Sequence, residues 1–269
     1  MQTVRSIKKV EHRYMTGEMP LLVTCSDYNA YICKYMRSSA SAYKLACELI
    51  GHRFADIWKL NTPKTAFVMI KPDHWPALSG SHSVSAPCIG SRKVGDVLDV
   101  TPSTIECIER NGYALKELLL IALFDFWIAN EDRNSNNYNL LYDVSGLHLL
   151  AIDFGCIFNT ATYDYPMSQL TSTDTVLYSE LFDELSRNVD EGKMSGYCME
   201  LRNHYDACLS KCRHYASALP TLLPDEWHIP KTAVEEKLRQ LFESEWTDGV
   251  WNNFTECLKE YYVNGKIKI

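Results

Sequence analysis

The spacing of apolar residues changes near residue 100 of this chain. Before that point, short segments rich in β-branched and aromatic residues alternate with turn signals, a pattern typical of β-strands. The expected strands are residues 4–14, 21–25, 30–36 and 67–70. One helical pattern, at residues 40–54, lies among them and should end between Ile57 and Pro63. The sequence therefore predicts that residues 1–100 form a small N-lobe that is mainly sheet.

The remainder of the chain follows a mainly helical pattern. Apolar faces at helical spacing predict helices at residues 112–128, 175–187, 199–218, 232–242 and 251–262. A β-hairpin interrupts them, with strands at residues 138–142 and 147–152 around a turn at residues 143–146. We therefore expect an α+β fold with two lobes, in which a larger helical C-lobe over residues 101–269 faces the N-lobe across a ligand-binding cleft.

Composition and charge argue against several classes of protein. Apolar residues make up 46% and charged residues 23%, as in ordinary globular proteins. The longest apolar stretch, residues 118–128, is interrupted by Asp125 and is shorter than the roughly 20 residues of a membrane-spanning helix. A net charge of −7 without a long basic run disfavours direct binding to nucleic acid. The N-terminus carries no apolar signal region, so we expect a cytoplasmic protein.

The ten cysteines are scattered and never form Cys-x-x-Cys, which favours reduced, largely buried thiols. His204, Cys208 and Cys212 recur every four residues and would share one face of the helix predicted over residues 199–218. That geometry is compatible with a zinc ion. Cysteines spaced along an amphipathic helix are also ordinary packing residues, and the paired-ligand spacing of zinc sites is missing. Packing is therefore the favoured interpretation.

The segment from Asp132 to Gly155 carries the most specific pattern. Asn137 follows Asp132 by five positions, and the predicted hairpin ends at Asp153-Phe154-Gly155. Phosphoryl transfer requires an oriented acceptor and metal ions that neutralise phosphate charge. An Asp can orient an acceptor hydroxyl, and amide and carboxylate oxygens are the hard ligands that Mg²⁺ prefers. A polar turn would also explain the asparagines, but the ordered combination across helix, loop and hairpin favours a functional site.

This combination resembles the catalytic and metal-binding loops of kinases. The Asp-Arg order, followed by several asparagines, is most similar to HipA-like kinases and more distantly to phosphatidylinositol kinases. The resemblance implies a protein-kinase-like fold that binds ATP and Mg²⁺, with Asp132 as the catalytic residue and Asn137 and Asp153 as metal ligands. It further implies a protein substrate and leaves room for an antitoxin-like protein partner.

A lysine and a glutamate lie upstream of this segment. Lys34 is in the strand predicted at residues 30–36, and Glu48 is in the helix that follows. In kinases a strand lysine binds the ATP phosphates and a helix glutamate positions it, so the resemblance assigns these roles to Lys34 and Glu48. Exposed strands and helices also carry such residues without a function. Lys44 is a competing phosphate ligand, disfavoured by its place in the predicted helix.

Two further segments leave alternatives open. The turn at residues 16–20 lies where a phosphate-covering loop would, which makes Thr16 and Gly17 candidates for nucleotide binding through backbone N–H groups. It has one glycine, and Glu18 would repel phosphate, so an ordinary hairpin turn is an equal interpretation. Residues 81–92 are rich in Ser and are expected to connect the lobes or to form a loop near the nucleotide. Asp125 is either buried and bonded to the predicted catalytic loop or exposed to solvent.

The sequence therefore favours an ATP- and Mg²⁺-dependent kinase that phosphorylates a hydroxyl group, which by resemblance belongs to a protein Ser or Thr. A pseudokinase or nucleotide-binding regulatory module is one alternative, and an AMP transferase on the same fold is another. The presence of Asp132, Asn137 and Asp153 argues against a pseudokinase, whereas the poor phosphate loop leaves that alternative open.

Overall fold

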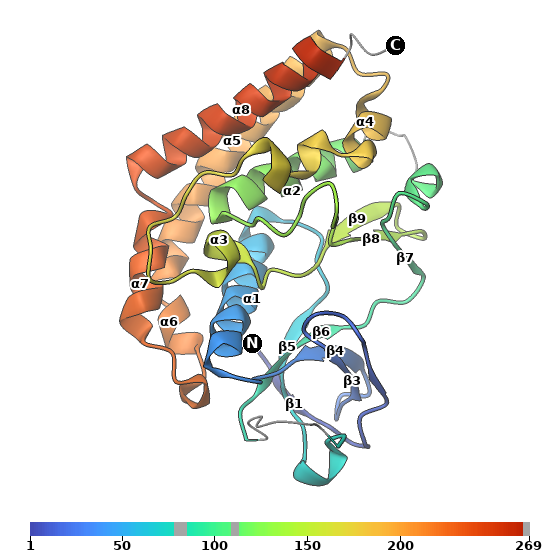
Figure 1. The fold of residues 1–269 in the computed structure, drawn as a ribbon, viewed down its shortest axis with the longest axis vertical. Coiled ribbons are helices and arrows are strands. Elements are labelled where there is room, and N and C mark those ends of the chain that lie inside the picture. Colours follow the sequence, from blue (N-terminus) through green and yellow to red (C-terminus); the bar gives the residue numbers. More distant parts are fainter. Residues whose placement is uncertain (78–84, 109–112, 266–269) are drawn as a thin grey trace.

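The structure, a computed structural model, describes residues 1–77, 85–108 and 113–265. A six-stranded sheet forms one end of the molecule and most of the helices form the other (Figure 1). This combination of a sheet lobe and a helical lobe confirms the predicted fold class. The boundary expected at residue 100 stays a prediction.

The sheet of the N-terminal lobe has the strand order β1-β5-β6-β4-β3-β2, with β1 parallel to β5 and the other neighbours antiparallel. Its strands are β1 (Thr3–Arg5), β2 (His12–Arg13), β3 (Leu21–Thr24), β4 (Ala30–Lys34), β5 (Thr65–Met69) and β6 (Cys88–Arg92). The strands predicted at residues 21–25, 30–36 and 67–70 are confirmed. The single strand predicted at residues 4–14 is wrong, because the chain crosses there from one edge of the sheet to the other.

Strand β6 corrects the prediction of a connecting loop at residues 81–92. Cys88–Arg92 is a central strand between β5 and β4, and residues 81–84 lie outside the described residues. A Cβ at Gly90 would lie 2.5 Å from Cγ2 of Val68 and 3.1 Å from Cβ of Tyr31. Glycine is required where neighbouring side chains crowd the backbone, and its small size hides the strand pattern in the sequence.

A second, three-stranded antiparallel sheet combines β7 (Val97–Asp99), β8 (Leu140–Asp143) and β9 (His148–Ala151). The predicted hairpin is confirmed as β8 and β9. Oδ1 of Asp143 closes its turn by accepting hydrogen bonds from the N–H groups of Ser145 and Gly146, both at 2.9 Å. Strand β7 was not predicted and pairs with β8 from far away in the chain.

Helix α1 (Ser39–Trp58) begins at a capping box. The N–H of Ser41 donates to Oγ of Ser38 at 3.3 Å, and the N–H of Ser38 donates to Oγ of Ser41 at 2.8 Å. The helix ends at Lys59, whose left-handed conformation (φ 63°) closes its last turn. The predicted end between Ile57 and Pro63 is confirmed.

The cluster of His204, Cys208 and Cys212 packs against the end of α1. Nε2 of His204 lies 2.9 Å from the carbonyl oxygen of Trp58 and 3.3 Å from Sγ of Cys208. Both cysteines are buried. Within the described part of the chain, no group of three or more His, Cys, Asp or Glu side chains is arranged to hold a metal ion. These residues therefore pack their own helix against the end of α1.

The remaining helices are α2 (Tyr113–Ile128), α3 (Ile157–Ala161), α4 (Glu180–Ser186), α5 (Glu191–Ala216), α6 (Leu219–Leu222), α7 (Lys231–Gln240) and α8 (Ser244–Gly265). Helix α5 begins earlier than predicted because Oδ1 of Asp190 caps it, accepting the N–H of Lys193 at 2.7 Å. Among the helices of the described residues, none combines the length and the apolar character that crossing a membrane requires.

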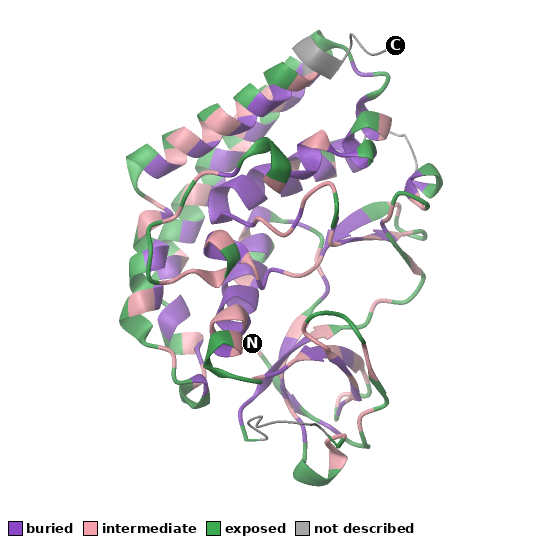
Figure 2. Cartoon of the chain, in the orientation of Figure 1, coloured by how far each residue is buried: buried purple, intermediate pink, exposed green. Residues whose placement is uncertain are grey.

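The buried residues form two cores (Figure 2). The smaller core lies within the sheet and includes Leu21, Val23 and Val68. The larger one joins α1 to the helical lobe, and in it the rings of Trp58 and Trp127 stack with centroids 5.4 Å apart. Helix α1 therefore packs mainly with the helical lobe, although it follows the first strands in the chain.

Candidate functional site

Lys34, at the end of β4, is surrounded by three carboxylates. Its Nζ contacts Oε1 of Glu48 on α1 and lies 2.5 Å from Oδ1 of Asp153, which follows β9. Oε2 of Glu18, in the turn between β2 and β3, lies 3.1 Å from the same nitrogen. Acidic residues from three separate segments therefore meet at one ammonium group, and they include the predicted partner Glu48.

Burial and the neighbouring charges together set the pKa values of the groups in this cluster. It opposes the charge of Lys34, but Glu48, Asp153 and Glu18 outweigh it and raise the pKa of Lys34 well above its usual range. Burial raises the pKa of Glu48 to about 7. At Asp153 burial is outweighed by Lys34 and by the N–H of Gly155, which hold the pKa of that carboxyl well below its usual range. Asp153 therefore stays ionised, as a ligand for a cation must.

The turn after β9 fixes the Asp153 carboxylate. Asp153 has φ 61°, in the left-handed region that non-glycine residues seldom adopt, and the N–H of Gly155 donates to its Oδ1 at 3.3 Å. The ring of Phe154 is fully buried and packs edge-on against His52 and Phe124, with centroids 4.9 and 5.9 Å apart. Phe154 thus anchors the turn in the larger core.

Helix α1 passes very close to this turn. A Cβ at Gly51 would lie 2.4 Å from the Cβ of Phe154. The next residue, His52, is 3% exposed, and its Nε2 lies 3.6 Å from Oε2 of Glu48. Within the described ranges, neither ring nitrogen of His52 has a hydrogen-bond partner. Burial lowers the pKa of His52 to about 3, so the ring is neutral behind the Lys34 cluster.

A buried ion pair holds the loop that follows α2. Asp125 accepts hydrogen bonds from Nδ2 of Asn130 and Nε of Arg133, both at 2.8 Å. Arg133 is fully buried and also donates to the carbonyl oxygens of Tyr138 and Asn139. Asp125 is therefore buried and bonded to this loop, and the solvent-exposed alternative is wrong. Removing either partner would leave an uncompensated charge in the core.

Asn139 contacts Asp132, although the sequence pattern does not mark it as a site residue. Its Nδ2 donates to Oδ2 of Asp132 at 3.0 Å and to the Asp132 carbonyl oxygen at 3.3 Å. Asn139 has φ 46°, which Asn tolerates better than most residues. Its own carbonyl accepts the N–H of Ile152 at 3.1 Å, which links Asp132 to the strand before Asp153. The available signal was another asparagine two positions beyond Asn137.

Asn137 lies on the same loop. Its main-chain N–H donates to the carbonyl oxygen of Asn134 at 3.2 Å, and the N–H of Asn134 donates back at 3.0 Å. This tight turn leaves the side chain of Asn137 exposed, where a ligand can reach its amide oxygen. Its role as a metal ligand stays a prediction.

The thiol of Cys156, directly after Gly155, lies where several charges converge. Burial is the largest cause that raises the pKa of Cys156 to about 12; the carboxylates of Asp132 and Asp153 also raise it, and Lys44 lowers it. Asp132 and Asp153 are linked through Asn139, whose side chain donates to Oδ2 of Asp132 and whose carbonyl oxygen accepts the N–H of Ile152, the residue before Asp153. The assignment of Asp132 as the catalytic residue stays a prediction.

Glu131 ties the segment after Asp153 to the same loop. Its Oε1 accepts a hydrogen bond from Nδ2 of Asn159 at 2.6 Å, and its Oε2 accepts one from Oγ1 of Thr160 at 2.9 Å. The N–H of Asn159 also donates to the carbonyl oxygen of Ala129 at 2.9 Å. Both Asn159 and Thr160 have positive φ, a conformation that costs free energy and is held by these bonds.

Thr16 and Gly17 are exposed in the turn between β2 and β3. The carbonyl oxygen of Gly17 accepts a hydrogen bond from Arg37 at 3.4 Å. It is their neighbour Glu18 that contacts Lys34. The participation of Thr16 and Gly17 in nucleotide binding stays a prediction.

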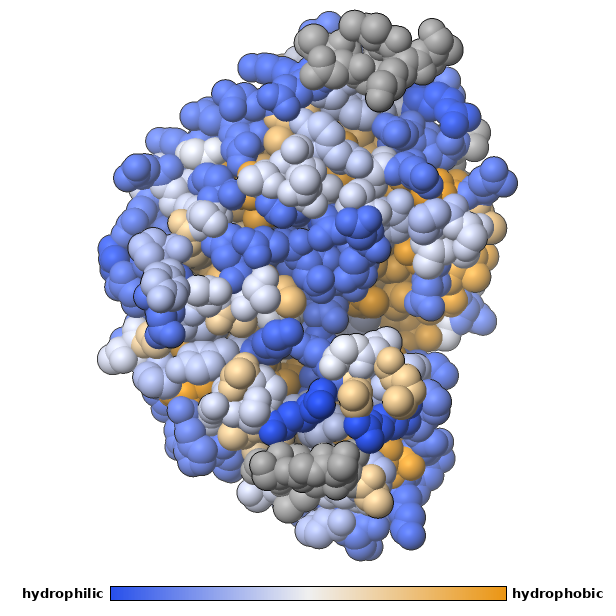
Figure 3. Space-filling model, viewed as in Figure 1, coloured by the Kyte–Doolittle hydropathy of each residue, from blue (hydrophilic) through white to orange (hydrophobic). Residues whose placement is uncertain are grey.

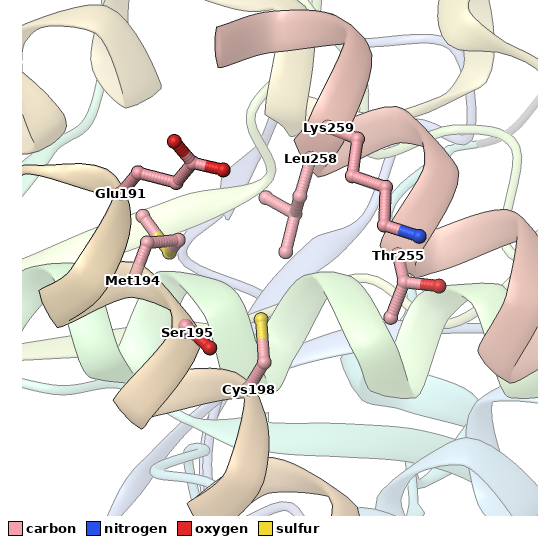
Figure 4. Close-up of a pocket in the computed structure, with 7 residues that line it drawn as sticks. All are labelled: Glu191, Met194, Ser195, Cys198, Thr255, Leu258 and Lys259. Atoms are coloured by element: carbon pink, nitrogen blue, oxygen red, sulfur yellow. The ribbon is translucent and has the colours of Figure 1, made fainter.

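The surface is hollowed between the two lobes, beside an area of apolar side chains (Figure 3). A separate cavity of about 490 Å³ lies between α5 and α8, where Met194 and Cys198 are opposite Leu258 (Figure 4). Its lining residues come from these two helices alone, so it is not part of the Lys34 cluster.

The donor chemistry fits magnesium. Mg²⁺ in nucleotide sites is commonly held by one or two protein oxygens together with phosphate oxygens and waters. Asp153 provides a carboxylate that stays ionised, and Asn137 provides an exposed amide. These two residues would hold the ion without the third protein ligand that a zinc site requires.

A sheet lobe, a helical lobe, and a strand lysine that joins a helix glutamate to the Asp of Asp-Phe-Gly define the kinase class of proteins. The sequence model of the HipA-like kinase family matches residues 7–248, and the chain belongs to this family. The predicted resemblance is thereby confirmed.

A solved kinase structure shares this fold. The proinflammatory kinase CtkA of Helicobacter pylori aligns with a TM-score of 0.51 and 12% identity, over 94% of this chain and 99% of that one. At this identity the likeness shows the fold alone. The open conformation of CtTel1 aligns with a TM-score of 0.34 and 10% identity, over 88% of this chain and 11% of that one, and carries no argument. No curated protein matches the sequence.

Proposed function

We propose that this protein is an ATP- and Mg²⁺-dependent kinase that transfers the γ-phosphoryl group to a hydroxyl group, with a protein Ser or Thr as the acceptor. The observation that carries the proposal is the cluster at Lys34, where Glu48 and Asp153 meet one ammonium group. Membership of the HipA-like kinase family supports the class of reaction. The Ser or Thr acceptor rests on the family resemblance.

In this proposal Lys34 binds phosphate oxygens and Glu48 orients it. Glu48 is 2% exposed, so water screens its contact with Lys34 very little. A lysine held in this way keeps its positive charge at a fixed point, where it stabilises the negative charge that develops on the phosphate oxygens in the transition state. Thr16 and Gly17 would cover the nucleotide through their N–H groups.

Asp132 would accept the proton of the acceptor hydroxyl. The hydrogen bond from Asn139 to Oδ2 fixes the carboxylate and leaves Oδ1 as the oxygen that takes the proton. The acceptor oxygen then forms its bond to the γ-phosphorus while the bond to the ADP oxygen breaks. Asn137 and Asp153 would hold Mg²⁺, which neutralises the charge of the phosphates when it is bound.

Incubation with Mg²⁺ and ATP labelled at either the α- or the γ-phosphate tests the proposal. We expect γ-label on a Ser or Thr, identified by mass spectrometry. Label from the α-phosphate would instead indicate AMP transfer, and ATP binding without any transfer would indicate a pseudokinase. Asp132→Ala should lower transfer by about 100-fold or more and leave ATP binding intact. Asp99→Ala, an exposed change on β7, is the matched control.

The class of acceptor and the protein partner rest on the family resemblance alone. A protein substrate, an antitoxin-like protein partner and a cytoplasmic location all stay predictions. Recovery of a specific partner in complex with the full chain would support the second of these, and a chain that stays alone at physiological concentration would contradict it.

A further inference from the structure

The carboxylate of Glu18 bridges two lysines. Its Oε2 lies 3.1 Å from Nζ of Lys34 on β4, and its Oε1 lies 3.1 Å from Nζ of Lys44 on α1. Each oxygen therefore pairs with a different ammonium group. The sequence predicts only that Glu18 repels phosphate, and it disfavours Lys44 as a phosphate ligand because that lysine lies in a helix.

The two lysines and the carboxylate between them have the geometry of an anion site. Two ammonium groups repel each other, so an anion that contacts both stabilises the arrangement. The carboxylate oxygens of Glu18 stand in the positions that two phosphate oxygens could take. Lys34 is also paired with Glu48 and Asp153, whereas Lys44 is held here by Glu18.

Lys44 also lies near the proposed site of transfer. Glu18 links it to Lys34, and Lys34 contacts Asp153, so the ammonium group of Lys44 lies beside the residues that would bind the phosphates and the metal ion. Its charge also acts on the thiol of Cys156, three positions after Asp153. The side chains of Glu18 and Lys44 are 29% and 35% exposed, so their ion pair is weak enough for a polyphosphate to displace the carboxylate.

We propose that Lys44 is a second phosphate-binding residue and that Glu18 occupies the phosphate position of the nucleotide-free protein. Nucleotide binding then requires the turn at residues 16–20 to carry Glu18 away from both lysines. This inference rests on the proposed function, because the polyphosphate is that of ATP. It predicts that Glu18 competes with the nucleotide and that Lys44 binds it.

Calorimetric binding of inorganic tripolyphosphate and of Mg²⁺ with a non-hydrolysable ATP analogue tests the inference without catalysis. Glu18→Gln removes the competing charge at nearly constant size, and we expect it to tighten the binding of both probes by about tenfold. Lys44→Met should weaken both by about tenfold, and Lys44→Arg should restore binding because it keeps the charge. In the double variant with Glu18→Gln and Lys44→Met, most of the gain should disappear.

Two matched controls isolate the local effect from net charge. Glu11→Gln changes an exposed glutamate that pairs with Lys8, and Lys116→Met changes an exposed lysine that pairs with Glu200. Each has the same net charge as the corresponding test variant and should bind both probes like the wild type. Thermal unfolding of every variant checks that the fold is retained.

The outcomes separate the inference from the proposed function. If Lys44→Met binds both probes like the wild type, or if Glu18→Gln does not bind them more tightly, the inference is wrong, even if γ-phosphoryl transfer is observed. If tripolyphosphate binding follows Glu18 and Lys44 but no transfer occurs, the anion site stands and the kinase proposal falls. Failure of the Glu18→Gln variant to bind tripolyphosphate overturns the anion site itself.

Discussion

Nζ of Lys34 lies 2.5 Å from Oδ1 of Asp153, although 119 positions separate the two residues in the chain. The contact joins the last residue of β4 to the turn after β9, and thereby joins the two lobes. In the proposed site this carboxylate would have two tasks, because it pairs with the lysine and would also bind the metal ion.

Replacement of Asp153 tests this shared carboxylate. Asp153→Ala should lower the affinity for ATP in the presence of Mg²⁺ by about tenfold or more, because both the lysine partner and the metal ligand are lost. Calorimetric titration with Mg²⁺ and again with a chelator measures the contribution of the metal. Wild-type protein and Asp99→Ala should bind more tightly with Mg²⁺. The same Mg²⁺-dependent gain in Asp153→Ala would remove Asp153 from the metal site.

Asn139 is expected to act by positioning Asp132. Asn139→Gly removes the amide donor and retains a residue that accepts positive φ, so the backbone is not strained. We expect kcat to fall by about tenfold while the KM for ATP stays constant, because the amide contacts Asp132 rather than the lysine cluster. Asn136→Gly, at an exposed position of the same loop, should leave both parameters unchanged. Equal losses in the two variants would indicate a general effect on the loop.

Gly51 and Gly196 form a matched pair for testing the close approach of α1 to Phe154. Alanine normally stabilises a helix by about 0.5–1 kcal/mol relative to glycine, and this is expected for Gly196→Ala on α5, where a Cβ meets nothing within 4 Å. Gly51→Ala should instead lower the free energy of unfolding by about 1–3 kcal/mol, since the new methyl group overlaps Phe154. Chemical denaturation measures both changes. Stabilisation by Gly51→Ala would show that the turn can shift without cost.

His52 should make the protein sensitive to acid. Its pKa is about 3 in the folded protein and 6.5 in the unfolded chain, so between these values the unfolded chain binds a proton that the folded one does not. The contribution of neutral His52 to the free energy of unfolding is therefore fully present above pH 6.5. It is lost as the pH falls toward 3, at up to about 1.4 kcal/mol per pH unit.

Leucine cannot ionise, so His52→Leu should lack this contribution. Urea unfolding between about pH 7.5 and 4.5 should show the variant gaining stability relative to the wild type as the pH falls. His12→Leu, at an exposed position, serves as the control and should follow the wild-type curve. Parallel curves for His52→Leu and wild type would contradict the assignment of a buried neutral ring.

The positions of residues in elements with a clear local pattern could be predicted from the sequence. Lys34 and Glu48 lie on a strand and a helix with clear apolar periodicity, and the hairpin before Asp153 has an ordinary turn. The strand around Gly90 was missed, because its small residue is required by neighbours that are distant in the sequence. Local pattern describes an element but not what packs against it.

The same limitation applies to residues whose surroundings the sequence left open. Asp125 lies in an apolar helix, and whether it is buried depends on Arg133 folding back onto it. Glu18 was expected to repel phosphate, yet its charge is balanced by lysines from a strand and a helix. Charge pairing between separate elements leaves no periodic trace in the sequence, so only the three-dimensional arrangement reveals it.

The Lys34 cluster connects two parts of the molecule that have different cores. Lys34 extends from the sheet, most of whose buried side chains form the smaller core, whereas Glu48 and Asp153 belong to the part of the molecule that contains α1 and Phe154. A rotation of the sheet relative to that part would lengthen or shorten these ion pairs, and it would also displace Ile89 of β6, whose side chain belongs to the larger core. The Lys34 ion pairs therefore couple the position of the sheet to the geometry of the proposed site.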